Sequence, residues 1–341
     1  MRRQILSVIG ILAALSSTQA DELLMKNGSV IIGTLVSAER DQVVFNTPFA
    51  GKITVKQENI ERISTEEPVT VLMNDGTLYK ESQIVSTEQA MLVKKEGEKS
   101  MVLKTEEIDM VNPEPWKLGE GYKWTGRAMV AVEFERGNSD TDLWEFDLDS
   151  VWRSLIDRYT VEFDLENETK NGNKTEENWN LLTKYDRFLG SEPNTPNYWG
   201  VKGEFEHDRI ADLDLRSKVG PYLGRQFFDT DRLRLQAELG PVYVDEKFDE
   251  ADDQDWWGAS WIVKAESNIT GFGTTLYVNH DGTQNLEESG DLILNTVIGI
   301  RFPLLYGFET AFEAEYEYDG GAVSGVDELD ETYNWKLGYA W

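Results

Sequence analysis

The chain of 341 residues has no cysteine and only two histidines, and its acidic residues far outnumber its basic ones. Without cysteine there is no disulfide, no thiol nucleophile and no thiolate metal site. The 33 Lys and Arg residues face 63 Asp and Glu residues, for a formal net charge of −30. Because a nucleic-acid backbone is bound by clustered Lys and Arg, this balance excludes nucleic-acid partners. Nothing in the sequence indicates a cofactor.

Long apolar runs are also missing. Residues 1–20 have the pattern of a secretory signal, with Arg2 and Arg3 before a short apolar stretch, Ile5 to Leu15, and a small-residue cleavage site. We expect a mature chain from Asp21, with 31 basic and 63 acidic residues and a formal charge of −32. Beyond this signal no apolar run reaches the about eighteen residues of a spanning helix. A membrane crossing must therefore use closed β-sheet, because lipid offers the backbone no hydrogen-bond partner.

An internal repeat with an offset of 48 residues covers residues 21–113. Its clearest match lays LLMKNGSV (Leu23 to Val30) over VLMNDGTL (Val71 to Leu78). Asn27-Gly28 and Asp75-Gly76 are dipeptides of tight hairpins in which both residues take positive φ. The repeat predicts one small β module present twice, over residues 21–66 and 67–113.

Each of these two units resembles a small barrel of the Sm-like or SH3-like kind. Sm-like units bind RNA, but residues 21–116 carry 17 acidic and 10 basic residues. We expect either a periplasmic spacer or a pair of modules, residues 21–113, that bind a periplasmic partner. The stiff sequence Pro113-Glu114-Pro115 ends this region, and residues 114–123 are predicted to form a linker.

From Trp124 to Trp341 the sequence alternates apolar and polar residues in segments of about ten, the pattern of strands in an outer-membrane β-barrel. Three segments run from Ala128, Trp144 and Tyr159. The others begin near Trp179, Trp199, Leu213, Leu233, Trp257, Phe272, Leu292, Phe308 and Tyr333. The sequence therefore predicts an all-β protein whose residues 124–341 form an antiparallel barrel of twelve strands, with the two SH3/Sm-like repeats before it.

The energy of burying charge in lipid decides which face points inward. An Arg or Lys facing hydrocarbon at mid-depth costs about 2–4 kcal/mol, so rows of charged side chains are expected to face the lumen. The predicted lumen-lining residues are Glu145, Asp147, Asp149, Glu162, Asp164, Glu204, Glu206, Arg216, Lys218, Arg234, Glu313 and Glu315.

The last segment ends in aromatic and aliphatic residues at every second position: Tyr333, Trp335, Leu337, Tyr339 and Trp341. We expect this strand to close the sheet against the first one with its apolar face on lipid. A terminal aromatic strand of this kind is similar to the C-terminal signal read by the barrel-assembly machinery.

The connections between segments predict long polar loops at one end of the barrel and short turns at the other. The predicted long loops include KNGNKTEE from Lys170 and DGTQNLEESG from Asp281. Pro221 and Pro241, each after a glycine, fall within predicted strands, where proline removes a ladder hydrogen bond. A bulge or kink is expected at each of them.

The stretches YDRFLG (Tyr185 to Gly190) and GEFEHDRIADLDLRSKVGPYLG (Gly203 to Gly224) resemble the DUF481 family, described as salt-induced outer-membrane proteins. The most specific part is the run from Asp208 to Arg216, and the resemblance covers roughly Trp124 to Trp341. Relatives tend to have a second glycine-x-glycine stretch where this chain has Gly220-Pro221-Tyr222-Leu223-Gly224. The resemblance implies an outer-membrane barrel and brings no catalytic residues.

Sequence features that could support chemistry are few. His207 and His280 are predicted at the loop-side ends of strands, and neither has a nearby serine, so an outer-membrane hydrolase is the weakest hypothesis and we expect no enzyme. The acidic loop from Asp249 to Asp255 lacks the spaced glycine and closing glutamate of an EF-hand. A solvated loop is the better interpretation, and loose divalent-ion bridging to lipopolysaccharide the alternative.

Two functional hypotheses from different classes therefore remain for a protein in the bacterial outer membrane. The first is a narrow, cation-preferring channel whose charged lining sets its ion preference. The second is a non-conducting membrane anchor whose N-terminal modules bind an envelope partner in the periplasm. The expected partners are outer-membrane lipid, the barrel-assembly machinery and that periplasmic partner.

Overall fold

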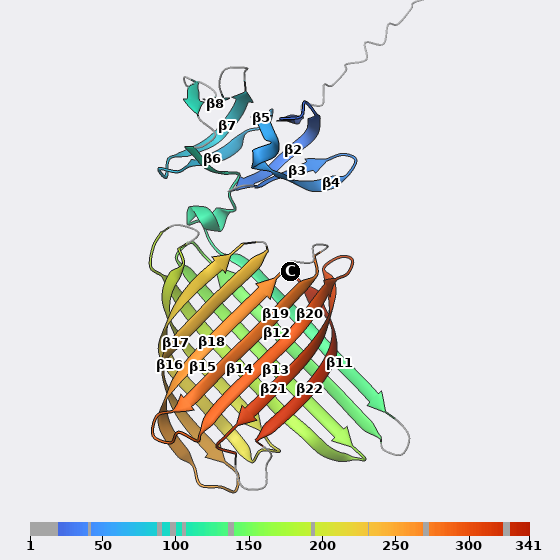
Figure 1. The fold of residues 1–341 in the computed structure, drawn as a ribbon, viewed down its shortest axis with the longest axis vertical. Helices are drawn as coiled ribbons and strands as arrows, with labels where there is room; N and C mark the ends of the chain where they lie inside the picture. Colours follow the sequence, from blue (N-terminus) through green and yellow to red (C-terminus); the bar gives the residue numbers. More distant parts are fainter. Residues whose placement is uncertain are drawn as a thin grey trace, which may run out of the picture. The chain divides into compact units, whose positions relative to one another are not determined.

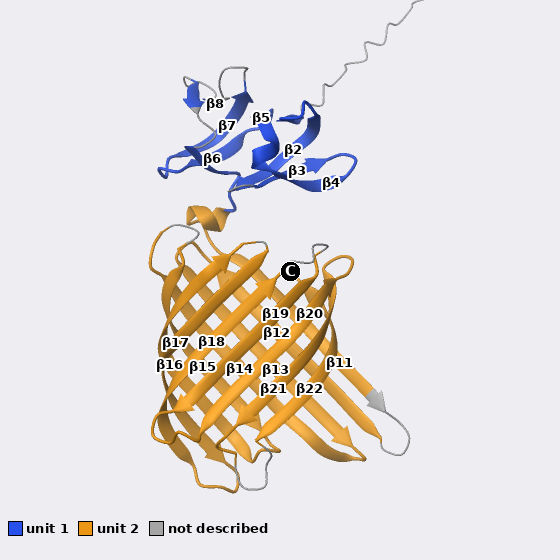
Figure 2. Cartoon of the chain, viewed as in Figure 1, with its two compact units in different colours: residues 1–114 blue, residues 115–341 orange. Residues whose placement is uncertain are grey.

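The structure is a computed structural model that describes residues 20–39, 42–86, 91–95, 100–103, 107–135, 140–191, 195–230, 232–268, 273–322 and 328–341. The predicted secretory signal lies almost wholly outside these residues. The chain forms two compact units, Met1–Glu114 and Pro115–Trp341 (Figure 2). None of the helices in the described ranges is long and apolar enough to cross a membrane.

The first unit is built from ten strands and a short 3-10 helix, η1 (Gln57–Asn59) (Figure 1). The strands are β1 (Asp21–Met25), β2 (Val30–Glu39), β3 (Gln42–Thr47), β4 (Gly51–Lys56), β5 (Ile60–Ser64), β6 (Val69–Met73), β7 (Leu78–Ser86), β8 (Met91–Lys95), β9 (Met101–Leu103) and β10 (Ile108–Val111). β1 and β6 begin 48 residues apart, as do β2 and β7 and also β5 and β10. The strands therefore recur at the offset of the sequence repeat.

Pairing shows how the two repeats depend on each other. β1 pairs with β2 and β5, and β6 pairs with β7 and β10 in the same way. β10 also pairs with β2 of the first repeat, through Met110 with Glu39 and Val111 with Ala38. In return the Thr65 N–H, just after β5, donates to the Ile84 carbonyl of β7 at 2.8 Å.

One apolar core serves both repeats. Its fully buried members include Leu23 and Phe45 from the first repeat and Val71 and Ile84 from the second. The unit is therefore two copies of one strand order packed around a common centre.

The hairpin turns of this unit differ from the prediction in detail. Only the glycines, Gly28 and Gly76, have positive φ, 84° in both, and the Gly28 N–H donates to the Met25 carbonyl at 2.9 Å. This is the longer hairpin, a turn followed by a left-handed glycine, and the predicted two-residue turn with two positive φ values is wrong here. The sequence Asn-Gly is compatible with both, so the dipeptide alone does not decide.

The second unit begins with a 3-10 helix, η3 (Pro115–Leu118), and is otherwise a closed antiparallel barrel of twelve strands (Figure 1). The strands are β11 (Lys123–Glu135), β12 (Thr141–Arg153), β13 (Asp157–Lys170), β14 (Asn173–Phe188), β15 (Asn197–Asp208), β16 (Leu213–Asp229), β17 (Leu233–Phe248), β18 (Gln254–Ser267), β19 (Thr275–Asn285), β20 (Leu292–Pro303), β21 (Phe308–Asp319) and β22 (Leu329–Ala340). The predicted all-β fold and strand number are confirmed.

Pairing of the last strand with the first closes the barrel. β11 and β22 pair from Arg127 with Ala340 to Val130 with Leu337. Two backbone hydrogen bonds between Gly126 and Trp341, of 3.0 and 3.1 Å, extend this contact to the last residue of the sequence. The terminal aromatic residue is thus part of the closure.

Two of the predicted long loops are wrong, because the strands continue into polar sequence. β13 and β14 are joined by a two-residue turn, Asn171 and Gly172, with φ of 51° and 81°, as in a type I′ hairpin. β19 continues past Asp281 to Asn285. Gly282 lies within this strand opposite Trp261 of β18, and a Cβ on it would lie 2.2 Å from the Trp261 ring, so the glycine is required by packing and not by a turn. The two ends of the barrel therefore differ less in loop length than predicted.

Pro221 and Pro241 produce no bulge between β16 and β17, so the predicted bulge is wrong. Val219 pairs with Tyr243 and Leu223 with Leu239, and this unbroken register places the two prolines opposite each other. At the prolines the ladder between β16 and β17 is interrupted between those pairs, while the ladders to β15 and β18 run on there. The two register shifts of the β16–β17 ladder lie away from the prolines, between Leu213 and Leu215 and between Gln226 and Phe228. The two missing N–H donors thus share one position, which limits the disruption to a single gap between two strands.

Candidate functional site: the charged interior of the barrel

The register of each strand separates an apolar outer face from a charged inner face. Along β12, Trp144 is 45% exposed whereas Glu145 is 4% exposed, and along β16 the values are 69% for Leu223 and 5% for Tyr222. Such an arrangement is that of a barrel with lipid outside and polar groups inside.

All twelve predicted lumen-lining residues lie at inward positions of this register: Glu145, Asp147, Asp149, Glu162, Asp164, Glu204, Glu206, Arg216, Lys218, Arg234, Glu313 and Glu315. Arg234 is at the rim, with its side chain 62% exposed and 3.4 Å from Glu266. The other eleven line the interior at different depths.

Ion pairs reach across the interior between strands that are not neighbours. Lys264 of β18 lies 2.5 Å from Glu162 of β13, and Arg216 of β16 lies 2.6 Å from Asp319 of β21. In each case four other strands separate the two strands along the wall. These side chains therefore bridge the lumen and narrow it.

A buried network fills part of the barrel between β13 and β17. Lys184 Nζ lies 2.5 and 2.6 Å from the carboxylate oxygens of Glu238, and the Tyr198 hydroxyl donates to the same carboxylate at 2.8 Å. Beside it, Arg158 Nε lies 2.5 Å from Asp186, which also accepts a hydrogen bond from a tyrosine hydroxyl. Every charge in this group is paired, which is the condition for keeping ions away from water.

A second group of carboxylates surrounds one lysine. Lys336 Nζ of β22 lies 2.7 Å from Asp147, 3.0 Å from Glu313 and 3.3 Å from Glu145. One positive charge thus faces three negative ones, and the Tyr277 hydroxyl donates a further hydrogen bond to Glu313.

Other inward carboxylates have no ion-pair partner among the described residues: Asp164, Glu166, Glu315 and Glu317. Asp164 is exposed although it lies on the inner face, and its electrostatic neighbours include Asp147, Asp149 and Glu315. Asp149 is likewise accessible, with 49% of its side chain exposed, although it lies 3.5 Å from Arg127. The interior therefore contains water-accessible space lined by unneutralised negative charge.

The histidines occupy the outer face. His280 is in the middle of β19, so its predicted place at a strand end is wrong, and it lies between Trp261, at 3.0 Å, and Thr296, at 2.8 Å. An indole N–H can only donate, so His280 Nε2 accepts and Nδ1 carries the proton that is donated to Thr296. His207, at the end of β15, has Nδ1 2.8 Å from the Asp214 carbonyl.

The loop from Asp249 to Asp255 does not gather its carboxylates. Tyr243 donates to Asp255 at 3.0 Å, and the Phe248 N–H lies 3.4 Å from Asp253. Within the described ranges no three His, Cys, Asp or Glu side chains are arranged to hold a metal ion.

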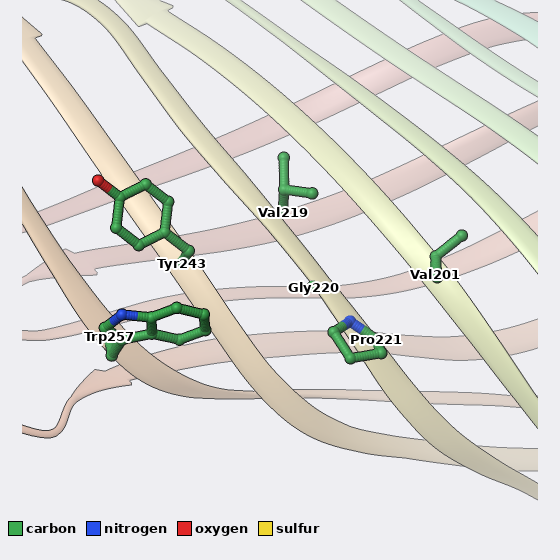
Figure 3. A pocket seen from close by; sticks show the side chains of 6 residues that line it. All are labelled: Val201, Val219, Gly220, Pro221, Tyr243 and Trp257. Carbon is green, nitrogen blue, oxygen red and sulfur yellow. The ribbon is translucent and has the colours of Figure 1, made fainter.

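A shallow groove of about 470 Å³ lies on the outer surface of the barrel at the paired prolines (Figure 3). Its lining is almost entirely apolar: Val201, Val219, Gly220, Pro221, Tyr243 and Trp257. The side chains of Val201, Val219, Pro221, Tyr243 and Trp257 belong to the outward register, and Gly220 contributes only backbone, so the groove faces the surroundings of the barrel and not its lumen.

Of the inward basic residues, the sequence analysis identified Arg216, Lys218 and Arg234. It did not include the following inward basic residues: Arg127, Arg158, Lys184, Lys202, Lys264, Arg301 and Lys336. Each of them is an even number of residues away from other inward side chains on its own strand. The alternation of inward and outward side chains along a strand was therefore the signal that could have identified them. Their partners, however, are mostly on distant strands, which that period does not reveal.

The closed antiparallel wall, the apolar exterior and the charged interior define this unit as a porin-like β-barrel of the outer-membrane type. The chain belongs to the family described as "Protein of unknown function, DUF481", whose profile matches residues 128–341. The resemblance seen in the sequence is thereby confirmed.

Comparison with solved structures finds other barrels. The NanC porin has 10% identity and a TM-score of 0.40, with 64% of this chain and 98% of that chain covered. The outer-membrane channel DcaP of Acinetobacter baumannii has 8% identity and a TM-score of 0.32, covering 95% and 94%. The β domain of the Bordetella autotransporter BrkA has 11% identity and a TM-score of 0.29, covering 65% and 99%. No curated protein matches the chain.

Proposed function

We propose that this protein is a narrow, cation-preferring channel of the bacterial outer membrane, with residues 21–113 in the periplasm. The observation that carries the proposal is the excess of unpaired inward carboxylates. The buried inward lysines each have a carboxylate within 4.0 Å, whereas Asp164, Glu166, Glu315 and Glu317 have no ion-pair partner among the described residues. A lumen with this imbalance attracts cations and repels anions.

The bridges across the lumen limit what passes. Glu162 with Lys264 and Arg216 with Asp319 divide the interior at different depths. A path beside such bridges suits small hydrated ions better than large solutes. This supports a pore of low conductance.

The membrane location is supported by the outer surface and by the residue pattern of β22. The exposed apolar residues of the barrel include Leu223, Leu239 and Trp335, at 69%, 62% and 65% exposure, a surface that water disfavours and lipid accepts. Tyr333, Trp335, Leu337 and Tyr339 alternate along β22, the pattern expected for recognition by the barrel-assembly machinery. Outer-membrane lipid and that machinery are therefore the proposed partners.

Recordings in planar bilayers test the channel. With a KCl gradient across the membrane, we expect discrete current steps and a reversal potential shifted from zero toward the equilibrium potential of K⁺. Asp164→Asn combined with Glu315→Gln should move the reversal potential toward zero, because each carboxylate some 6 Å from a passing ion changes its energy by about 0.7 kcal/mol in water-like surroundings. Glu250→Gln, a charge removed from an exposed loop, is the matched control and should leave the reversal potential unchanged. Anion preference in the wild-type protein contradicts the proposal.

A non-conducting anchor is the second candidate, and the bridged interior favours it. Its N-terminal unit also exposes apolar side chains, with Phe49 at 81% and Val102 at 63%. Electrical silence of folded protein, together with an envelope protein retained by residues 21–113, would replace the channel by this function.

We also propose that the barrel is not a hydrolase. The ring of His280 donates its Nδ1 proton to Thr296, so in this arrangement it cannot take a proton from that hydroxyl. Loss of lipid or ester hydrolysis on changing His207 and His280 to alanine would reverse this conclusion.

A further inference from the structure

The seam between β11 and β22 is paired over only part of its length. β11 pairs with β12 along all thirteen residues, Lys123–Glu135, but with β22 only from Arg127 to Val130. From Ala131 to Glu135, β11 has no ladder partner in β22, although β22 continues through Thr332–Lys336 beside β21. In Figure 1 the C-terminal part of β11 diverges from the neighbouring β22.

An unpaired strand edge has consequences in a bilayer. The backbone N–H and C=O groups of Ala131–Glu135 that point away from β12 have no ladder partner among the described residues of β22. Hydrocarbon does not satisfy them, and for this reason open sheet edges facing lipid are not tolerated. The gap must therefore admit polar groups, from water in the lumen or from the head group of an amphiphile.

The two sides of the gap differ in character. Outside, Val132 of β11 and Trp335 of β22 are 58% and 65% exposed, and Trp335 is stacked on Phe312 with ring centroids 6.5 Å apart. Apolar and aromatic side chains thus border the gap where lipid would lie. They suit an alkyl or aromatic tail.

Inside, the gap is bordered by carboxylates. Ala131 is opposite Glu145 on β12, and on the other side Thr332 is opposite Glu315 of β21. Lys336, the basic residue at the gap, is already shared by three carboxylates. The charge remaining beside the gap is negative, so the complementary head group is cationic.

We propose that the gap between β11 and β22 is a lateral aperture through which an amphiphile with a cationic head group moves between the lumen and the surrounding lipid. The inference rests on the proposed membrane location and acidic lumen. The tail follows Val132 and Trp335 while the head group passes along Glu315, and the three carboxylates around Lys336 add net negative charge beside it. An anionic amphiphile is repelled by the same carboxylates.

Paired cysteines test the aperture cleanly, because the natural chain has no cysteine. Continuing the register places Val132 opposite Trp335, four residues beyond the paired Ala128 and Tyr339 on the same face. The control pair Ala128→Cys with Tyr339→Cys should oxidise to a disulfide, whereas Val132→Cys with Trp335→Cys should keep free thiols, since a disulfide needs Cα atoms within about 7 Å. Equal oxidation of the two cysteine pairs overturns the aperture. A disulfide-linked dimer of the single variant Val132→Cys also overturns it, because it would mean that a second copy of the chain covers the strand edge.

Transport then tests the ligand class. Purified protein in vesicles is given a fluorescent trimethylammonium amphiphile or its sulfonate counterpart, and each pair is bridged with a short bismaleimide. Bridging residues 132 and 335 should reduce entry of the cationic probe to the rate of protein-free vesicles and leave K⁺ conductance intact, and bridging 128 and 339 should change neither. Folding of each variant is checked by gel electrophoresis without boiling, in which a folded barrel migrates differently from the boiled protein. If the variant with Val132→Cys and Trp335→Cys does not fold, it is replaced by Glu133→Cys with Asn334→Cys, the next inward pair.

The outcomes separate this inference from the channel itself. If the protein conducts K⁺ but the bridge between residues 132 and 335 does not slow entry of the cationic probe, the aperture is overturned and the channel is not. The same holds if the protein conducts K⁺ and the sulfonate probe enters as fast as the cationic one. Bridge-sensitive entry of the cationic probe without K⁺ conductance supports the aperture and overturns the axial channel.

Discussion

The buried pair of Lys184 and Glu238 offers the sharpest test of the interior. Their side chains are 3% and 2% exposed, and the lysine makes two hydrogen bonds to the carboxylate. Lys184→Met removes the charge and keeps the volume. It leaves Glu238 with the Tyr198 hydroxyl at 2.8 Å and Arg158 at 3.9 Å, too little to neutralise a buried charge.

Breaking a buried pair from one side costs about 3–5 kcal/mol, and the remaining contacts of Glu238 place the expected loss near the lower limit, about 3 kcal/mol. The double variant Lys184→Met with Glu238→Gln leaves no unpaired charge. Its loss should therefore be smaller than the sum of the two single losses, with a coupling of about 2 kcal/mol.

Urea unfolding in detergent micelles, followed by tryptophan fluorescence, measures these free energies. Lys174→Met is the control, because its ion pair with Glu177 is largely exposed, with 40% of the lysine side chain accessible, and should not matter measurably. A Lys184→Met midpoint equal to that of the wild type, or single losses that simply add, would refute the idea that the interior is held together by cross-strand ion pairs.

Two further predictions concern the wall and the first unit. Gly240→Ala should lower the fraction of folded barrel on an unboiled gel, because its Cβ would lie 2.1 Å from the Pro221 carbonyl oxygen. Gly203→Ala is the control and should fold normally, because its Cβ would lie 3.5 Å from the nearest atoms. Equal folding of the two variants would refute this account of the gap at the prolines. The Thr77 N–H, 2.8 Å from Asp75, holds the pKa of that carboxyl below its ordinary 3.8. The stabilisation of the fold by this hydrogen bond is therefore complete above about pH 4 and is lost as the pH falls through the lowered pKa. An NMR titration of the Asp75 carboxyl with a midpoint at or above 3.8 would contradict this prediction.

The barrel was predictable from the sequence because its signal is local. Alternation of Trp144 with Glu145 along β12 says which side meets lipid, whatever the rest of the chain does. The same period, continued from strand to strand, led to the number of strands and to the closing role of the end of the chain. The fold and the family resemblance were accordingly correct.

Loop boundaries failed where distant residues decide them. Asp281-Gly282 has the composition of a turn, yet Gly282 continues the strand because the Trp261 ring of the neighbouring strand occupies the space of its missing side chain. Asn171-Gly172 was read within a long polar loop and is a two-residue turn. In both cases polar residues that face the lumen, such as Glu168 and Thr283, belong to the strand, so polarity did not mark its end.

The arrangement of the interior charges was out of reach for a related reason. Which carboxylate meets Lys264 depends on the tilt and stagger of the strands, and Glu162 lies 102 positions away in the chain. The sequence identified the charged face of each strand but not the bridges, and the bridges decide how much of the lumen stays open.

The first unit has a consequence of its own. Because β10 of one copy is hydrogen-bonded to β2 of the other, and Leu23 and Val71 share one core, neither repeat encloses its apolar residues alone. The two copies behave like the subunits of an obligate dimer that the chain has tied together. Substitutions in either copy are felt by both, and a protein that lost one of them would lose the other as well.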